Sequence, residues 1–204
     1  MALILGLDPS QNTGWALYDP SREISTIRCG IIKFTAEAGK FEQNASRLGR
    51  AFATFVKEQG RPDFAVIEQA PRQPAGQFKA KAQVKTVRFM GQEMPAQSGD
   101  DETSGGGGLQ STLSTNQMAA ALASILGAYN VPFVTMTDSD WRKRAYGFGR
   151  QKGWARKEWK KHSRQQCMQQ KIHVTNDDMA EACWIAFAGA SSDEFKMLSM
   201  RAAA

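Results

Sequence analysis

The most informative segment of the chain is Asp178-Met179-Ala180-Glu181-Ala182-Cys183-Trp184-Ile185-Ala186-Phe187, an apolar run with two carboxylates three residues apart at its start. At 3.6 residues per turn Asp178 and Glu181 share one helix face, and the opposite face is also apolar. We therefore expect a helix buried nearly all round. Two carboxylates in such a site repel each other and lose hydration, and the helix has no basic residue beside them. A divalent cation would compensate them; the alternative is a helix cap, residues 175–178, with acidic first-turn residues.

Two further acids stand where short apolar strands end. The run Leu3-Ile4-Leu5-Gly6-Leu7 stops at Asp8, and Phe64-Ala65-Val66-Ile67 stops at Glu68. Each of these acids taken alone could simply face solvent. Together with an acidic pair on a buried helix, they can assemble a carboxylate cluster that holds hard cations through oxygen ligands.

Three blocks of sequence, in this order, resemble the RuvC family of Holliday-junction resolvases within the RNase H-like nuclease superfamily. They are residues 3–9 with Thr13-Gly14, Ser46-Arg47-Leu48 with Pro62 to Gln69, and residues 178–182. The resemblance covers most of the chain apart from about 72–112. It implies that the metal-binding and catalytic tetrad is Asp8, Glu68, Asp178 and Glu181.

The activity implied by this resemblance is metal-dependent endonuclease cleavage that resolves four-way DNA junctions during recombination and repair. Two Mg²⁺ ions about 4 Å apart would activate a water and stabilise the leaving oxygen, with Mn²⁺ as a substitute. Asp8 would bridge the two ions, and the other three acids would complete their coordination. The resemblance also implies a homodimer, because a four-way junction presents two symmetric cleavage points.

The sequence departs from the family pattern at three places. Glu181 stands where an aspartate is usual, and Ser10 replaces a usual glycine. Ala70-Pro71 follows Glu68-Gln69, where the family commonly has an aromatic residue that helps to open the junction. These departures leave open a nuclease of the same fold that cuts flaps, forks or three-way junctions. A non-catalytic DNA-binding protein is a further alternative, which the four retained acids oppose.

A strongly basic segment extends from Trp141 to Lys171, with eleven Lys or Arg residues and one acid, Glu158. This imbalance is too one-sided for ion pairing along a helix, although a solvated helix surface is the usual explanation of such a run. Basic side chains neutralise phosphates, and the interleaved aromatic residues can stack on bases. The predicted DNA contacts are Lys143, Lys157, Lys160 and Lys161. By resemblance, Lys143 and Lys157 match basic positions near the scissile phosphate, and Lys157 is predicted to be catalytic.

The middle of the chain has a different composition. Residues 72–88 carry five basic residues and no acid, and four glycines follow at 105–108. Because consecutive glycines are costly to order, we expect a flexible insertion at about 72–112. It is either a surface loop without function or a basic arm that closes over DNA. In the second case its contacts would include Arg72, Phe78, Lys79 and Lys81.

The hydrophobic pattern predicts an α/β fold, and the resemblance implies the RNase H-like three-layer arrangement of a mixed five-stranded sheet flanked by helices. The predicted strands lie near 2–8, 14–19, 24–34, 63–68 and 131–136. The predicted helices lie near 44–59, 113–129, 138–145, 155–170 and 176–189. The 204 residues are expected to form a single nuclease domain, 1–204, that carries the insertion.

Composition narrows the remaining function classes. The net charge is +6, and the three cysteines have neither disulfide nor zinc-site spacing. No stretch approaches the roughly 20 apolar residues that span a bilayer, and the short N-terminal apolar run is not a signal peptide. We therefore expect a cytoplasmic protein of bacterial or viral origin with no membrane partner. An actin-like ATPase or sugar kinase would share the Asp8–Gly14 pattern but needs a second domain, for which the chain has no room.

Overall fold

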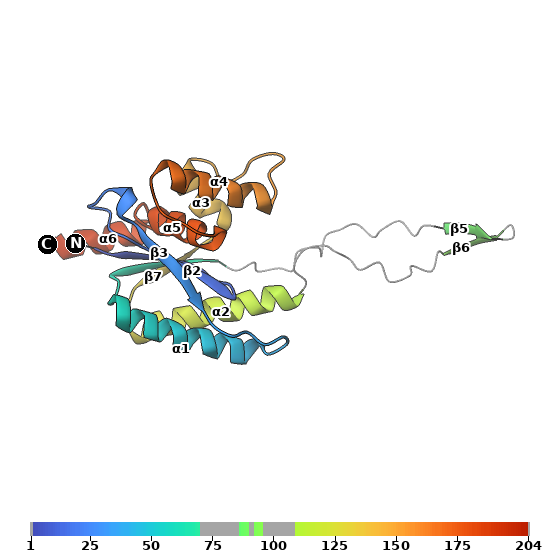
Figure 1. Cartoon of the computed structure of the whole chain (residues 1–204), viewed down its shortest axis with the longest axis horizontal. Coiled ribbons are helices and arrows are strands. Elements are labelled where there is room, and N and C mark those ends of the chain that lie inside the picture. Colours follow the sequence, from blue (N-terminus) through green and yellow to red (C-terminus); the bar gives the residue numbers. More distant parts are fainter. Residues whose placement is uncertain (1, 70–85, 90–91, 96–108, 204) are drawn as a thin grey trace.

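The computed structural model describes residues 2–69, 86–89, 92–95 and 109–203, and its centre is a five-stranded sheet (Figure 1). The strands are β1 (Ile4–Asp8), β2 (Asn12–Tyr18), β3 (Arg28–Lys33), β4 (Phe64–Glu68) and β7 (Phe133–Met136). They lie side by side in the order β3-β2-β1-β4-β7. Neighbours among β1, β2 and β3 are antiparallel, whereas β4 pairs in parallel with both β1 and β7. The predicted mixed sheet is confirmed.

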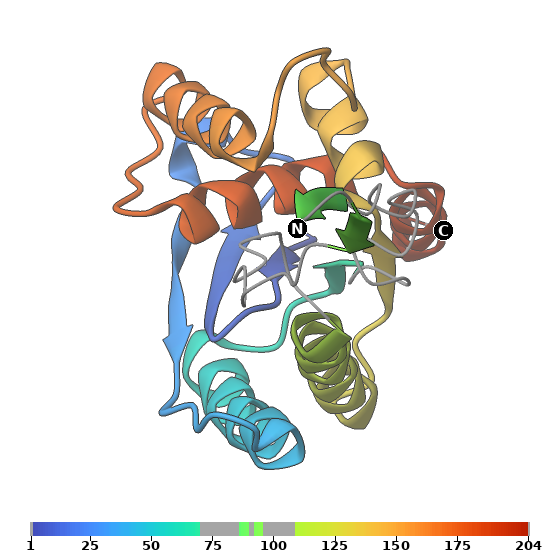
Figure 2. The same ribbon diagram turned by 90° about the vertical axis from the view of Figure 1, so that its right-hand side faces the viewer.

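Helices cover both faces of this sheet (Figures 1 and 2). One face is covered by α1 (Phe41–Gln59) and α2 (Leu109–Ala128). The other is covered by α5 (Asp177–Gly189), with α3 (Asp138–Tyr146) and α4 (Arg156–Gln169) packed against α5. Because both faces are covered, β1 and β4 are apolar on both sides, as their uninterrupted apolar sequence indicates. The three-layer α/β arrangement predicted from the sequence is therefore correct.

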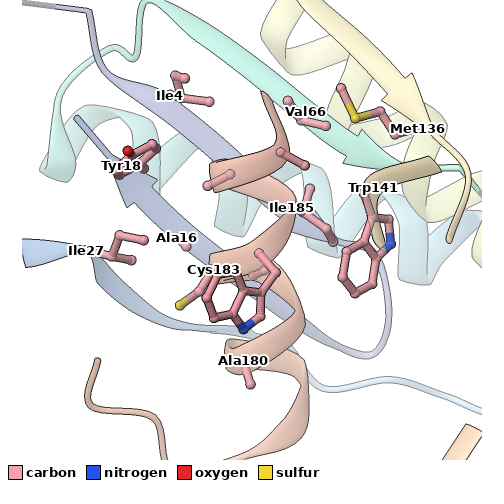
Figure 3. Close-up of a cluster of buried hydrophobic side chains, with 14 of the residues drawn as sticks. Ile4, Ala16, Tyr18, Ile27, Val66, Met136, Trp141, Ala180, Cys183 and Ile185 are labelled. Atoms are coloured by element: carbon pink, nitrogen blue, oxygen red, sulfur yellow. The ribbon is translucent and has the colours of Figure 1, made fainter. Parts of the chain in front are cut away.

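The helix α5 lies unusually close to β1 and β2 because two glycines face it. A Cβ atom on Gly14 would stand 2.1 Å from the carbonyl oxygen of Asp178, and one on Gly6 would stand 2.4 Å from that of Ala182. Any side chain at either glycine would push the helix away from the sheet. Figure 3 shows the buried cluster in which Cys183 and Ile185 of α5 meet side chains of the strands and of α3.

Large side chains fill the opposite face. Leu48 and Phe52 of α1 and Leu122 and Leu126 of α2 are fully buried against the sheet. They follow the spacing of three and four residues that marks the inner face of an amphipathic helix. This layer is an ordinary hydrophobic core.

Several boundaries differ from those predicted. A short 3-10 helix, η1 (Ile24–Thr26), precedes β3, so the strand predicted from residue 24 begins only at residue 28. The strand β2 begins at Asn12, two residues before the strand predicted from residue 14. Helix α1 begins at residue 41 rather than 44, and β7 begins at 133 rather than 131.

Part of the segment 72–112 has regular secondary structure. The strands β5 (Thr86–Phe89) and β6 (Gln92–Pro95) pair as an antiparallel hairpin, and α2 begins at Leu109 rather than at the predicted residue 113. The flexibility of the insertion stays a prediction. Its remaining residues lie outside the described ranges.

One helix was not predicted at all. Helix α6 (Asp193–Ala203) packs Phe195 against Phe64 of β4, with ring centroids 5.6 Å apart. Ser192 caps it by accepting a hydrogen bond from the backbone N–H of Phe195 at 3.2 Å. The serine followed by Asp193 and Glu194 is an N-terminal helix signal that the sequence already contained.

Candidate active site

Four acidic side chains gather at one edge of the sheet. β1 ends at Asp8 and β4 at Glu68, and because these neighbouring strands are parallel, both acids emerge at the same edge. Asp8 pairs with Gly14 across β1 and β2, and Gly14 in turn lies under the backbone of Asp178. The close approach of α5 thus sets Asp178, and Glu181 one turn later, beside Asp8.

Carboxylate oxygens of Asp8, Asp178 and Glu181 lie within 4.8 Å of one another. Glu68 lies beside this group, within hydrogen-bonding reach of Asp8. Glu181 is buried, with 6% of its surface exposed, and the other three acids are half-buried. The structure therefore brings together the four acids that the sequence singled out, three as a compact group and Glu68 as its neighbour.

Three of these carboxyls, those of Asp8, Glu68 and Glu181, have raised pKa values. Burial raises the pKa of Glu181 to about 7, and the charge of Asp8 adds to the effect. Burial, reinforced by Glu181, likewise raises the pKa of Glu68 to about 7. Burial raises the pKa of Asp8 well above its ordinary value, with Glu68 and then Asp178 raising it further. Removal from water is the main cause in each case, and mutual repulsion is the second.

Two cations from neighbouring helices reach the acids. The ammonium of Lys160, on α4, lies 2.9 Å from Asp178 Oδ1 and 3.7 Å from Glu181 Oε2. The guanidinium of Arg142, on α3, lies 4.0 Å from Glu181 Oε1. Although α5 has no basic residue beside its acids, the neighbouring helices α3 and α4 supply two. Lys160, which was predicted to contact DNA, contacts two of the acids; its contact with DNA stays a prediction.

Arg142 is held from several sides. Its guanidinium lies 2.7 Å from Asp138, one turn earlier on α3, and stacks 4.6 Å from the ring centre of Trp159. Because Asp138 shares this charge, the four acids are only partly neutralised by Arg142 and Lys160. The uncompensated negative charge and the oxygen-only donor set fit a hard divalent cation. The acidic cluster is thus compatible with a divalent metal site.

The aromatic residues of the basic segment pack mainly on one another. Trp141 and Trp159 are buried, so these two side chains belong to the core. The loop between α3 and α4 folds back so that Phe148 and Trp154 contact Trp159 and His162. This cluster fixes α3 and α4 relative to each other, and with them Arg142 and Lys160.

The remaining predicted residues are less directly placed. Lys143, Lys157 and Lys161 are exposed. The cations in contact with the acids are Lys160, which was predicted, and Arg142, which was not. Asp177 does not cap α5: Asn176 does, accepting from the N–H of Met179 at 2.9 Å. Asp177 instead pairs with Arg164 at 3.6 Å. The predicted DNA contacts in the middle of the chain lie outside the described residues: Arg72, Phe78, Lys79 and Lys81.

Sequence reasoning missed Arg142 and Trp141. The indole N–H of Trp141 is buried without a partner at hydrogen-bonding distance in the described part of the chain. It is nevertheless near enough to Glu68 to lower the pKa of that carboxyl against the larger effect of burial. The spacing of Asp138 and Arg142 by one helical turn was the only sequence signal for a fixed arginine here.

No protein-family model and no curated protein sequence matches this chain, whereas solved structures do. RuvC of Thermus thermophilus is similar, with a TM-score of 0.53, 13% identity, and coverage of 92% of this chain and 93% of that one. The T. thermophilus RuvC in complex with a Holliday junction substrate gives a TM-score of 0.55 and 12% identity, covering 93% of each chain. These similarities show that the chain has a RuvC-like fold of the RNase H-like class.

No helix in the described ranges is long and apolar enough to cross a membrane.

Proposed function

We propose that this protein is a structure-selective endonuclease that resolves four-way DNA junctions by metal-dependent hydrolysis of phosphodiester bonds. One observation carries the proposal: buried carboxylates converge where β1 and β4 end and α5 begins, within 4.8 Å for three of them. The fold supports the same activity, because one of the similar structures is a RuvC bound to a Holliday junction.

The acids Asp8, Glu68, Asp178 and Glu181 would hold two Mg²⁺ ions, with Mn²⁺ able to replace them. Bound ions of this kind supply Lewis-acid activation of a water molecule and neutralise charge on the leaving oxygen. The protein contributes position: β1 and β4 fix Asp8 and Glu68, while the glycine contacts with α5 fix the other two acids.

Basic side chains next to the acids would receive the phosphate. Lys160 and Arg142 already border the cluster, and Lys157 lies one turn before Lys161 on the exposed face of α4. We assign Lys157 to the reacting phosphate, and Lys143 and Lys161 to flanking phosphates. Their exposure leaves them free to move toward an anionic substrate, for which they supply phosphate neutralisation.

We further propose that the protein acts as a homodimer, since two symmetric nicks require two active sites. Light scattering of the pure protein and of its junction complex should give the mass of two chains. Paired nicks made within one binding event would support the same conclusion, whereas independent single nicks would oppose it.

A second candidate function is a nuclease of the same fold for flaps, forks or three-way junctions. The observation that favours it is the Ala70-Pro71 pair after Glu68-Gln69, where the resemblance calls for an aromatic residue. Without that side chain, the preference for a four-way branch point has to come from elsewhere in the protein.

One experiment separates these functions. Purified protein is incubated with Mg²⁺, Mn²⁺ or EDTA and with end-labelled four-way, three-way, flap and linear DNA of shared sequence, and the nicks are mapped. Symmetric nicks confined to the four-way junction support resolution, and faster cleavage of flaps or forks supports the second candidate. Binding without nicks in either metal would contradict both and favour a non-catalytic DNA-binding protein.

A further inference from the structure

A groove of about 890 Å³ lies between α4 and the segment that leads into α5. One wall carries Lys157, Lys161 and Arg164 of α4, and the other is formed by residues 172–174. This volume falls within the range of roughly 300–1,000 Å³ that is typical of ligand sites in proteins.

The second wall is held in place by backbone contacts. Lys171 takes a left-handed conformation with φ of 58°, and the next N–H, of Ile172, donates to the carbonyl of Cys167 at 2.9 Å. The thiol of Cys29, on β3, donates to the carbonyl of His173 at 3.4 Å. The wall is thus tied to both α4 and the sheet.

The groove is continuous with the candidate active site. Lys160 and Asp177 line it, and Lys160 also touches Asp178 at 2.9 Å. A polymer chain with one phosphate at the acids could therefore continue directly into the groove.

The lining combines positive charge with apolar surface. The one acid in the lining, Asp177, is paired with Arg164, whereas Lys157 and Lys161 are exposed. Met168 is 72% exposed at one end of α4, and the half-buried Val174 contributes apolar surface to the facing wall. Such a lining suits a ligand that is anionic along one edge and apolar along the other.

An unpaired DNA strand has this character, and a duplex does not. A duplex presents phosphates outward and keeps the faces of its bases stacked inside. A single strand exposes base faces, which stack on side chains such as histidine while cations track its backbone.

We infer that this groove holds the unpaired strand that continues from the reacting phosphate. Lys157, Lys161 and Arg164 contact its phosphates, and His173 and Met168 contact its bases. The inference rests on the proposed nuclease function and adds the form of the substrate: a strand unpaired next to the cleavage point. An acidic protein segment suits the groove less well, because the groove leads to a cluster of carboxylates.

The test uses two matched pairs of variants in the Asp8→Asn background, in which DNA is not cut. Lys161→Gln alters the groove, and Lys57→Gln removes the same charge from an exposed position on α1, which covers the opposite face of the sheet. Met168→Glu alters the groove, and Met200→Glu changes a methionine of α6 that is equally exposed, at 71%. Fluorescence anisotropy measures binding to a single strand and to a duplex of the same length, with circular dichroism to check folding.

Each groove variant should weaken single-strand binding by roughly five- to tenfold and duplex binding by less than about twofold. The two control variants should bind like the parent. Photocrosslinking of a strand that carries iodouracil should label the peptide containing residues 168–174.

Equal losses on both DNA forms, or none, would overturn the inference, as would tighter competition by poly-glutamate than by a single strand. Nicking of branched DNA by the enzyme with Asp8 intact is measured separately. If the enzyme does not nick branched DNA, the proposed function fails. If it nicks normally but the groove variants bind DNA as the parent does, only the inference about the groove fails.

Discussion

The two helical layers that cover the sheet are built in different ways. On the α1–α2 side, large aliphatic and aromatic side chains such as Phe52 and Leu122 fill the space between helix and strand. On the α5 side, glycines on the strands let the helix backbone come nearly into contact with the sheet. The first layer supplies buried apolar area, and the second fixes distances between charged groups.

This difference teaches where the protein tolerates change. A hydrophobic layer loses stability when it is trimmed, but its neighbours can relax into part of the space. A backbone-to-backbone contact can relax only if the whole helix moves, together with the side chains that it positions. We therefore expect damage on the α1–α2 side to appear as lost stability, and damage on the α5 side to appear as lost activity.

The largest effect should follow removal of the acids on the α5 side and at the strand ends. Asp8→Asn, Glu68→Gln and Asp178→Asn should each reduce nicking to the level of a reaction without enzyme, because each would remove a proposed metal ligand. Binding to a junction should be unchanged or tighter, since less negative charge faces the phosphates. The control is Asp193→Asn, a highly exposed acid at the start of α6. Near-full nicking by any of the three variants would remove that residue from the site.

The second effect tests the close contact itself. Gly14→Ala places a methyl group against the carbonyl of Asp178 and should lower nicking by roughly 100-fold through displacement of the acids. Gly127→Ala, on α2, meets open space and should instead stabilise the protein by about 0.5–1 kcal/mol. Urea unfolding and single-turnover nicking measure both variants. Parent-like nicking by a folded Gly14→Ala protein would show that the close approach of α5 to the sheet does not position the acids.

The third effect is confined to stability. Leu122→Ala empties a fully buried position on α2 and should lower the free energy of unfolding by about 2–5 kcal/mol. Nicking per folded molecule should stay within about threefold of the parent, measured well below the unfolding temperature. A much larger loss of activity would show that the α1–α2 layer also positions the acids.

The smallest effect concerns pH. Glu68 and Glu181 have pKa values of about 7 in the folded protein, against 4.5 ordinarily. Between pH 4.5 and 7 the folded state therefore holds protons that the unfolded chain has released, and stability falls as pH rises through this window. In EDTA the loss should be on the order of 1–3 kcal/mol, and saturating Mg²⁺ should reduce it. Urea unfolding at several pH values gives the free energy of unfolding as a function of pH. A free energy that rises with pH across this window would contradict the burial of these carboxyls.

Much of this arrangement could be predicted from sequence because it depends on local pattern. The apolar runs that end in Asp8 and Glu68 predict buried strands with acids at their ends, and the position of α5 follows from its apolar sequence. The two cations beside the acids could not be predicted in the same way. Lys160 and Arg142 reach the site only because α3 and α4 pack on α5, and their neighbours in sequence are equally basic.

The order of the acids along the chain has a consequence for synthesis. The 109 residues between Glu68 and Asp178 take at least about 5 s to translate, at roughly 5–20 residues per second. During that interval the carboxylate cluster is incomplete, so under the proposed function the nascent chain could not yet cut DNA. Over the same interval the sheet lacks the helix that covers one of its faces, and its apolar strands are exposed to neighbouring chains. Until α5 docks, the newly synthesised protein is most vulnerable to aggregation.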